Sequence, residues 1–177
     1  MTTRQLLLFR HAKAERSEPG MEDRARKLAD RGRKDAAMVG AYMASHALTP
    51  DDVVVSPAVR TRDTWKLAAA AFRSPPKVTA VERLYSATAH TILGVVSQVA
   101  PTTRRLLVVG HNPGLHEAAL MLVASGDTEA RERLRESLPT SGLVVIDFML
   151  DDWPKLHPRC GRLERFVTPK TLGTTAS

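Results

Sequence analysis

Short runs of apolar and β-branched residues alternate with longer segments of mixed polarity along this chain of 177 residues. Apolar runs of about four to eight residues between polar or turn residues are typical of buried strands. The run Leu-Leu-Val-Val at residues 106–109 has the composition of a parallel strand that is buried on both faces. By this pattern we predict strands at residues 5–9, 52–55, 77–81, 106–109, 142–149 and 163–167.

Apolar positions recur at roughly helical spacing between these runs, which predicts helices at residues 32–46, 57–72, 89–99 and 115–124. Residues 17–30 read as a polar loop with a turn at Pro19-Gly20, and residues 168–177 as a flexible, frayed tail. Strands that alternate with helices indicate an α/β fold with helices on both faces of the sheet. We therefore predict a three-layer α/β/α sandwich with a mostly parallel central sheet, in one domain spanning residues 1–167.

Polar side chains follow three of the predicted strands at the point where each strand ends. They are Arg10 and His11, then Ser56 with Arg60 shortly after it, and finally His111 and Asn112. In sheets of this kind ligands bind outside the carboxyl ends of the strands. The sequence therefore predicts that two arginines and two histidines meet at one edge of the sheet.

The charge of the chain favours an anionic ligand. The formal net charge is +7, and residues 1–34 hold ten Lys or Arg against five Asp or Glu. Nucleic acid, a membrane surface, a phosphorylated protein or a small phosphate could each balance such a charge. Aromatic residues make up only 5% of the chain, which argues against a single-strand nucleic-acid binder. We expect neither nucleic acid nor a membrane as the partner.

Three features of the sequence bear on the cellular location: the length of its apolar runs, its N-terminal stretch and its cysteine content. No apolar run approaches the roughly 20 residues that span a bilayer. The apolar stretch near the N-terminus is too short for a signal peptide. Cys160 is the only cysteine, so there is no disulfide framework and no thiolate metal cage. We expect a cytoplasmic protein.

A pair of histidines beside a pair of arginines has three possible explanations: a metal site, a structural role for each histidine, or phosphoryl transfer. Arginines disfavour a divalent cation, and neither His11 nor His111 has a carboxylate in a usual ligand spacing, so we expect no metal. Each histidine alone is best read as structural. Together with Arg10 and Arg60 they favour phosphoryl transfer, in which cations clamp the charged oxygens and a neutral histidine attacks phosphorus.

Three segments in this order carry a family resemblance: L-L-F-R-H-A, S-P-A-V-R-T-R-D-T-W and V-V-G-H-N-P-G-L. They resemble the histidine phosphatase superfamily, which has a phosphoglycerate mutase-like fold. R-K-L-A-D-R-G at residues 26–32 and L-P-T-S-G at residues 138–142 are similar to the short bacterial SixA-type phosphohistidine phosphatases. The resemblance runs from about residue 6 to residue 145.

The resemblance implies roles for four residues, and we expect no cofactor. His11 would be the nucleophile that becomes a phosphohistidine intermediate. Arg10 and Arg60 would clamp phosphate, and His111 would be the second histidine of the phosphate pocket. Asn112, which follows His111 and could orient the loop, is a further candidate for substrate binding.

The neighbours of these residues need separate interpretations. Arg62 lies two residues after Arg60, so it should point away from it on a helix, and we take it as structural. Lys13 and Arg26 either extend the positive field or are simply solvated. Ser141 could contact phosphate, but the sequence does not assign it this role.

The chain departs from one pattern of the superfamily. Many members place a catalytic Glu shortly after the third strand, where this chain has Ser86. Glu18, Glu22, Asp23 and Glu117 could replace it, and the sequence does not select among them. An alkoxide leaving group needs a proton, whereas a protonated phosphohistidine ring leaves as neutral imidazole.

The missing acid therefore favours a metal-independent phosphatase that acts on phosphohistidine in a protein. Two alternatives stay open. One is a general phosphatase for small phosphate esters with the same fold. The other is a module that binds phosphate or a phosphoprotein without turnover. A basic nucleic-acid binder ranks last.

Overall fold

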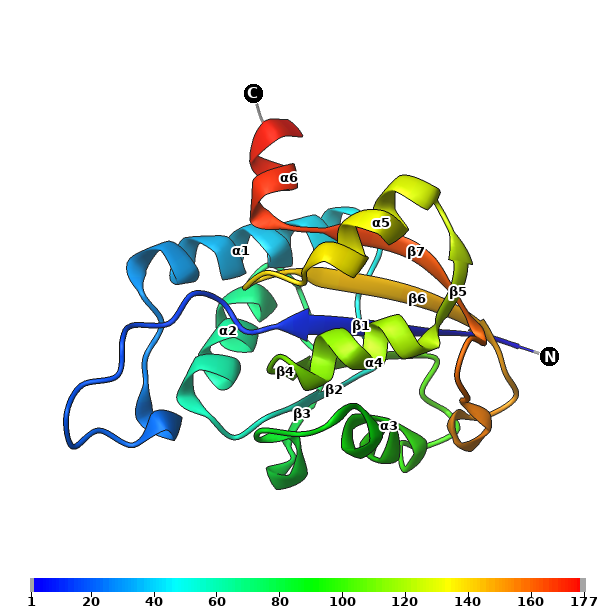
Figure 1. Cartoon of the computed structure of the whole chain (residues 1–177), viewed down its shortest axis with the longest axis horizontal. Coiled ribbons are helices and arrows are strands. Elements are labelled where there is room, and N and C mark those ends of the chain that lie inside the picture. Colours follow the sequence, from blue (N-terminus) through cyan, green and yellow to red (C-terminus); the bar gives the residue numbers. More distant parts are fainter. Residues whose placement is uncertain (1, 176–177) are drawn as a thin grey trace.

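A seven-stranded sheet with the order β3-β2-β4-β1-β6-β7-β5 lies at the centre of the computed structural model, which describes residues 2–175 (Figure 1). Strands β3, β2, β4 and β1 are parallel, β6 runs antiparallel to both β1 and β7, and β5 is parallel to β7. The prediction of a mostly parallel sheet is confirmed. The strands are β1 (Thr3–Arg10), β2 (Asp52–Val55), β3 (Val78–Ala80), β4 (Arg105–Gly110), β5 (Val123–Gly126), β6 (Leu143–Met149) and β7 (Gly161–Val167).

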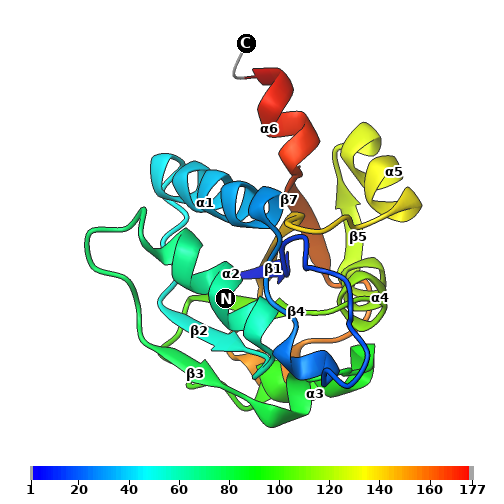
Figure 2. The same ribbon diagram turned by 90° about the vertical axis from the view of Figure 1, so that its left-hand side faces the viewer.

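Helices cover both faces of this sheet, as Figure 2 shows in a view turned by 90°. Helices α1 and α2 pack on one face, and α3, α4 and α5 on the other. The helices are α1 (Asp30–Ser45), α2 (Val59–Ala69), α3 (Ala89–Ser97), α4 (Gly114–Leu122), α5 (Thr128–Glu136) and α6 (Pro169–Thr175), with 3₁₀ turns η1 (Asp23–Ala25), η2 (Glu82–Leu84) and η3 (Trp153–Lys155). The predicted three-layer α/β/α sandwich is confirmed.

Strand β1 explains why the sheet must be covered twice. Leu6 and Leu8 point into the core beneath α3 and α4, whereas Leu7 and Phe9 point into the core beneath α1 and α2. All four side chains have no exposed surface. Burial of each contributes about 1.5–3 kcal/mol to stability, so both helical layers are needed to hold the central strand in place.

The C-terminal part of the chain differs from the expectation. Residues 169–175, part of the expected flexible, frayed tail at 168–177, form helix α6, and residues 176–177 lie outside the described residues. The hydroxyl of Thr168 accepts a hydrogen bond from the backbone N–H of Thr171 at 3.2 Å, and Pro169 occupies the first helical position. Thr-Pro is a helix-start signal that the apolar pattern does not include.

The segment between α4 and β6 also holds elements that the sequence analysis did not predict. Helix α4 ends at Leu122, and the next residues form strand β5 and helix α5. Helix α5 buries only Leu134, so it leaves no apolar periodicity in the sequence. Its capping residue is Asp127, whose carboxylate accepts from the N–H of Ala130 at 2.9 Å. Within residues 2–175, none of the helices is long and apolar enough for a membrane span.

Candidate functional site

The carboxyl ends of β1, β4 and β2 are adjacent, and this places their following residues together. Arg10 is in register with Gly110, and the N–H of His11 donates to the carbonyl of Gly110 at 3.1 Å. The N–H of Ser56 donates to the carbonyl of Val109, also at 3.1 Å. The strand ends that the sequence analysis singled out therefore form one edge, and their side chains face a common region.

His11 is held with one ring nitrogen free. Its Nδ1 lies 2.8 Å from the carbonyl oxygen of Ala12, which can only accept, so Nδ1 carries the proton and Nε2 keeps its lone pair. The N–H of Ala12 in turn donates to the hydroxyl of Thr64 at 2.9 Å, which fixes the loop. His11 is 9% exposed. Burial lowers its pKa to about 3, helped by the charges of His111, Arg60 and Arg10, so the ring is neutral.

His111 stands beside His11, with their ring centroids 5.4 Å apart. Nη2 of Arg60 lies 3.4 Å from Nδ1 of His111, and Oγ of Ser56 lies 2.7 Å from its Nε2. Because arginine can only donate, Nδ1 is the acceptor and Nε2–H donates to Ser56. Burial, followed by the charge of Arg60, lowers the pKa of His111 to about 4.

Arg10 and Asn112 are both fixed by the segment before β6. Nη1 of Arg10 and Nδ2 of Asn112 donate to the same carbonyl oxygen, that of Leu138, at 3.0 and 2.8 Å. The N–H of Ser141 donates to the carbonyl of His11 at 3.1 Å. Ser141 is fully buried, and its Oγ makes no hydrogen bond. The L-P-T-S-G segment thus braces the site through its backbone.

Arg60 is hydrogen-bonded to Asp23, which the sequence offered only as a candidate proton donor. Its Nη1 donates to the carbonyl oxygen of Asp23 at 2.8 Å, and its Nη2 donates to Oδ2 of Asp23 at 3.0 Å. The hydroxyl of Tyr85 also donates to this oxygen, and Nη1 of Arg26 donates to Oδ1 at 3.2 Å. These contacts, with that of Tyr85 the largest, hold the pKa of Asp23 far below its ordinary value.

Comparison with known proteins agrees with this geometry. A family model for the histidine phosphatase superfamily (branch 1) matches residues 6–87. An uncharacterized protein of Mycobacterium tuberculosis is 34% identical over 164 residues, which cover 92% of this chain and 100% of that protein. The chain belongs to the histidine phosphatase superfamily.

Two solved structures place this histidine phosphatase near the SixA type. A candidate phosphohistidine phosphatase SixA from Agrobacterium tumefaciens has a TM-score of 0.80 and 26% identity, covering 94% of this chain and 98% of that one. A candidate SixA from Nakamurella multipartitia has a TM-score of 0.83 and 26% identity, covering 96% and 98%. The family resemblance and the phosphoglycerate mutase-like fold expected from the sequence are confirmed.

A cavity of about 230 Å³ opens beside His111. Arg60, His111 and Asn112 line it, whereas Arg10 and His11 do not. Ser86 and Glu117 line it as well, and Glu117 is exposed in the first turn of α4. Of the four acids considered from the sequence, Asp23 contacts Arg60 and Glu117 lines this cavity, whereas Glu18 and Glu22 are exposed in the first loop.

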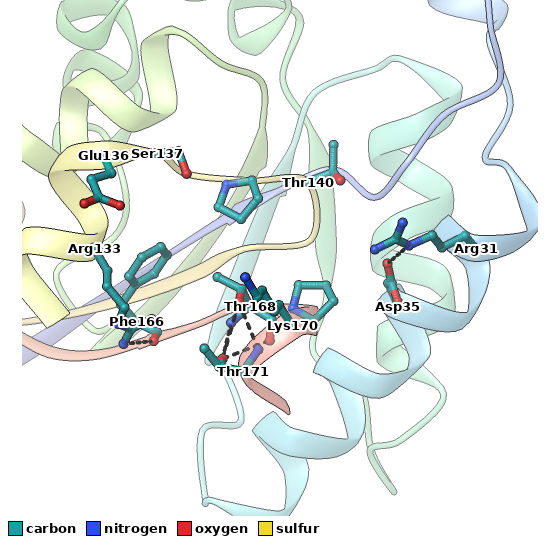
Figure 3. Close-up of a pocket in the computed structure, with 12 residues that line it drawn as sticks. Arg31, Asp35, Arg133, Glu136, Ser137, Thr140, Phe166, Thr168, Lys170 and Thr171 are labelled. Carbon is teal, nitrogen blue, oxygen red and sulfur yellow. Dashed lines mark hydrogen bonds and ion pairs between the residues drawn. The ribbon is translucent and has the colours of Figure 1, made fainter. Parts of the chain in front are cut away.

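A second pocket, of about 460 Å³, lies between the start of α1, the end of α5 and the start of α6 (Figure 3). Arg31 and Asp35 form an ion pair of 3.7 Å on one side, and Nη2 of Arg133 donates to the carbonyl of Phe166 at 3.2 Å on the other. None of the residues predicted for the site lines it. Thr140, which does, immediately precedes Ser141, whose N–H donates to the carbonyl of His11, so this segment connects the second pocket to the site.

The other basic residues considered from the sequence, Arg26, Lys13 and Arg62, lie outside the group formed by Arg10, Arg60 and the two histidines. Arg26 is tied to the first loop through Asp23 and through the carbonyl of Glu15 at 3.0 Å. Lys13 is exposed, and so is Arg62, which lies on α2 and lines a different pocket, away from the histidines. Among residues 2–175, no three His, Cys, Asp or Glu side chains are grouped as a metal ion would require.

Proposed function

We propose that this histidine phosphatase dephosphorylates phosphohistidine on proteins, by transfer of the phosphoryl group first to His11 and then to water, without a metal ion. The observation that carries the proposal is the state of His11. Its Nδ1–H is bound to the carbonyl of Ala12, and its low pKa keeps the ring neutral, so Nε2 has a lone pair for attack on phosphorus.

Arg10, Arg60 and His111 are suited to hold the transferred group. A phosphoryl group in transfer carries its charge on three equatorial oxygens, so positioning and cationic donors supply most of the catalysis. Arg10 uses only Nη1 in its contact with Leu138 and keeps Nη2 for a ligand. Nη2 of Arg60 lies 3.4 Å from Nδ1 of His111. A phosphate oxygen bound beside both atoms would accept from both once His111 carries its proton on Nδ1. Asn112 would shape this side of the pocket.

The contact of His11 with Ala12 serves the second step as well. When phosphorus is bonded to Nε2, the ring still carries a proton on Nδ1, held by the carbonyl of Ala12. As water attacks phosphorus, the P–N bond breaks and its electron pair returns to Nε2. His11 then leaves as neutral imidazole, so no separate acid is needed for this step.

The leaving group decides between substrate classes. An alcohol leaves as a strongly basic alkoxide unless an acid protonates it, whereas the imidazole of a protonated phosphohistidine leaves as a neutral ring. Ser86 stands where many superfamily members place a Glu, and Asp23 is ionised by its three donors. The site is therefore suited to phosphohistidine. The structural likeness to candidate SixA phosphatases supports the same substrate.

A general phosphatase for small phosphate esters is the second candidate. It is favoured by Glu117, which lines the cavity with Arg60 and His111 and could protonate an alkoxide. A module that binds phosphate without turnover is the third, and the unpaired donor atoms of Arg10 and Ser141 fit it as well.

A substrate panel tests these functions. We would measure kcat/KM for a phosphohistidine peptide, an aryl phosphate and an alkyl phosphate, with wild type and His11→Asn, in the presence and absence of EDTA. We expect phosphohistidine to be preferred over the alkyl phosphate by at least about 100-fold, no effect of EDTA, and no turnover by His11→Asn. Faster turnover of the alkyl phosphate would contradict the proposal in favour of the esterase, and binding of orthophosphate with no turnover at all would favour the module.

A further inference from the structure

Asp23 is tied to the phosphate-binding side of the site through a single nitrogen atom. Nη2 of Arg60 donates to Oδ2 of Asp23 at 3.0 Å and lies 3.4 Å from Nδ1 of His111. A phosphate oxygen that enters between Arg60 and His111 would share this nitrogen with Asp23. Two acceptors on one donor nitrogen lie about 5 Å apart, so the carboxylate of Asp23 would lie within reach of a group attached to that phosphate.

The carboxylate of Asp23 has capacity for a further donor. Its side chain is 50% exposed, and Oδ1 has one partner, Nη1 of Arg26 at 3.2 Å. Each carboxylate oxygen can accept two hydrogen bonds. The groups that face it are Arg60 from α2, Arg26 from its own loop and the hydroxyl of Tyr85, and all three donate to it. Asp23 is therefore an acceptor throughout the neutral pH range and has no proton to give.

The segment that carries Asp23 is anchored on its outer side. Arg24 forms an ion pair with Glu82, and its guanidinium lies 4.3 Å from the ring centroid of Tyr85. Tyr85 itself donates to Asp23 and packs its ring 5.5 Å from that of His111. Tyr85 thus contacts both Asp23 and His111, so the first loop and the turn after β3 meet beside the site, with the carboxylate half exposed.

We infer that Asp23 selects the leaving group: its carboxylate accepts a hydrogen bond from the N–H of the phosphohistidine ring and so favours this substrate over phosphate esters, which have no such donor. The inference rests on the proposed function. As Nε2 of His11 bonds to phosphorus, the P–N bond of the substrate breaks and its electron pair goes to the ring nitrogen. The ring departs as neutral imidazole with its other nitrogen still protonated, and Asp23 holds this proton on the ring.

The test is the ratio of kcat/KM for a phosphohistidine peptide to kcat/KM for an aryl phosphate. In Asp23→Asn we expect this ratio to fall about 10- to 100-fold, which is the value of one charge-assisted hydrogen bond. The alkaline limb of kcat for the peptide should also move to lower pH, because the ring in the complex loses its proton more easily. Asp23→Glu, which keeps a carboxylate, should restore part of the ratio. Glu15→Gln removes the same charge from an exposed position in the same loop and should leave the ratio unchanged.

Other results would overturn the inference or its basis separately. If Asp23 only orients Arg60, Asp23→Asn lowers both kcat/KM values by the same factor, and the ratio and the pH profile stay as in wild type. That result overturns the inference and leaves the proposed function standing. If wild type hydrolyses the aryl phosphate and not the phosphohistidine peptide, the proposed function itself fails. Thermal unfolding of each variant checks that the fold is kept, and Asp23→Glu serves as the test should Asp23→Asn unfold.

Discussion

Oγ of Ser56 lies 2.7 Å from Nε2 of His111, and both residues are buried. A hydroxyl can donate or accept, so Ser56 supports either tautomer of the ring. In the structure His111 accepts from Arg60 at Nδ1 and donates to Ser56. To bind a phosphate oxygen, His111 must carry its proton on Nδ1, and Ser56 must then donate to Nε2.

Ser56→Ala removes this partner and leaves the buried Nε2 of His111 unpaired. We expect a loss of about 1–3 kcal/mol in the free energy of unfolding and a fall of at least about 10-fold in kcat for the phosphohistidine peptide. Denaturant unfolding and steady-state kinetics measure the two effects. Ser56→Thr keeps a hydroxyl and is the control, and equal loss of kcat in both variants would argue for a steric effect alone.

The depressed pKa values of the two histidines predict how stability depends on pH. Their values in the folded protein are about 3 for His11 and about 4 for His111, against about 6.5 when unfolded. The unfolded chain therefore binds protons first as the pH falls. The stabilising contribution is complete above about pH 6.5 and is lost progressively as the pH falls through about 4 and 3.

Urea unfolding at pH 7.5 and pH 5.0 measures this loss. Between pH 7.5 and pH 5.0, each histidine should lower the free energy of unfolding by about 2 kcal/mol, because its ring takes up a proton only in the unfolded chain. His11→Gln should remove one of these contributions and flatten the profile. Equal pH dependence in wild type and His11→Gln would mean that the ring of His11 is protonated at about its ordinary pH in the folded protein.

Arg60 should not be replaceable by lysine. Its planar fork reaches Asp23 through two nitrogens and His111 through one of them, and a lysine ammonium cannot reproduce these directions. We expect Arg60→Lys to lower kcat/KM about 100-fold for every phosphorylated substrate. Arg62→Lys, an exposed position on the same helix, is the matched control and should stay within about twofold of wild type.

Gly32 is a packing requirement of the site. A Cβ at this position would lie 2.1 Å from the carbonyl oxygen of Lys13, two residues after His11. Gly32→Ala should therefore displace the loop that carries His11, cost about 1–3 kcal/mol of stability and lower kcat. Gly173→Ala has open space around its Cβ and serves as the control. Wild-type activity and stability in Gly32→Ala would show that the loop adapts without consequence.

The strand ends were predictable because one physical rule connects them. Residues 5–9 and 106–109 have the pattern of buried strands, and parallel strands bring their carboxyl ends to one edge. Arg10, His11 and His111 are therefore neighbours despite their separation along the chain. The family motifs then assigned expected roles to residues that the strand pattern had already grouped.

Other parts left no such pattern in the sequence. Asp23 reaches Arg60 across 37 positions from an irregular loop, and no periodicity predicts that contact. Helix α5 buries only Leu134, so its segment reads as polar. Helix α6 did have a signal, Thr168 followed by Pro169, which lay outside the apolar pattern on which the prediction relied.

Transfer of phosphate to His11 is the central claim, and trapping the intermediate tests it most directly. Wild type would be mixed with a phosphohistidine peptide, quenched in alkali within milliseconds, digested and analysed by mass spectrometry. We expect a phosphoryl adduct on the peptide that contains His11, formed and lost within the time of one turnover, and no adduct in His11→Asn. Release of phosphate by His11→Asn at the wild-type rate, with no adduct on His11 in wild type, would contradict the account.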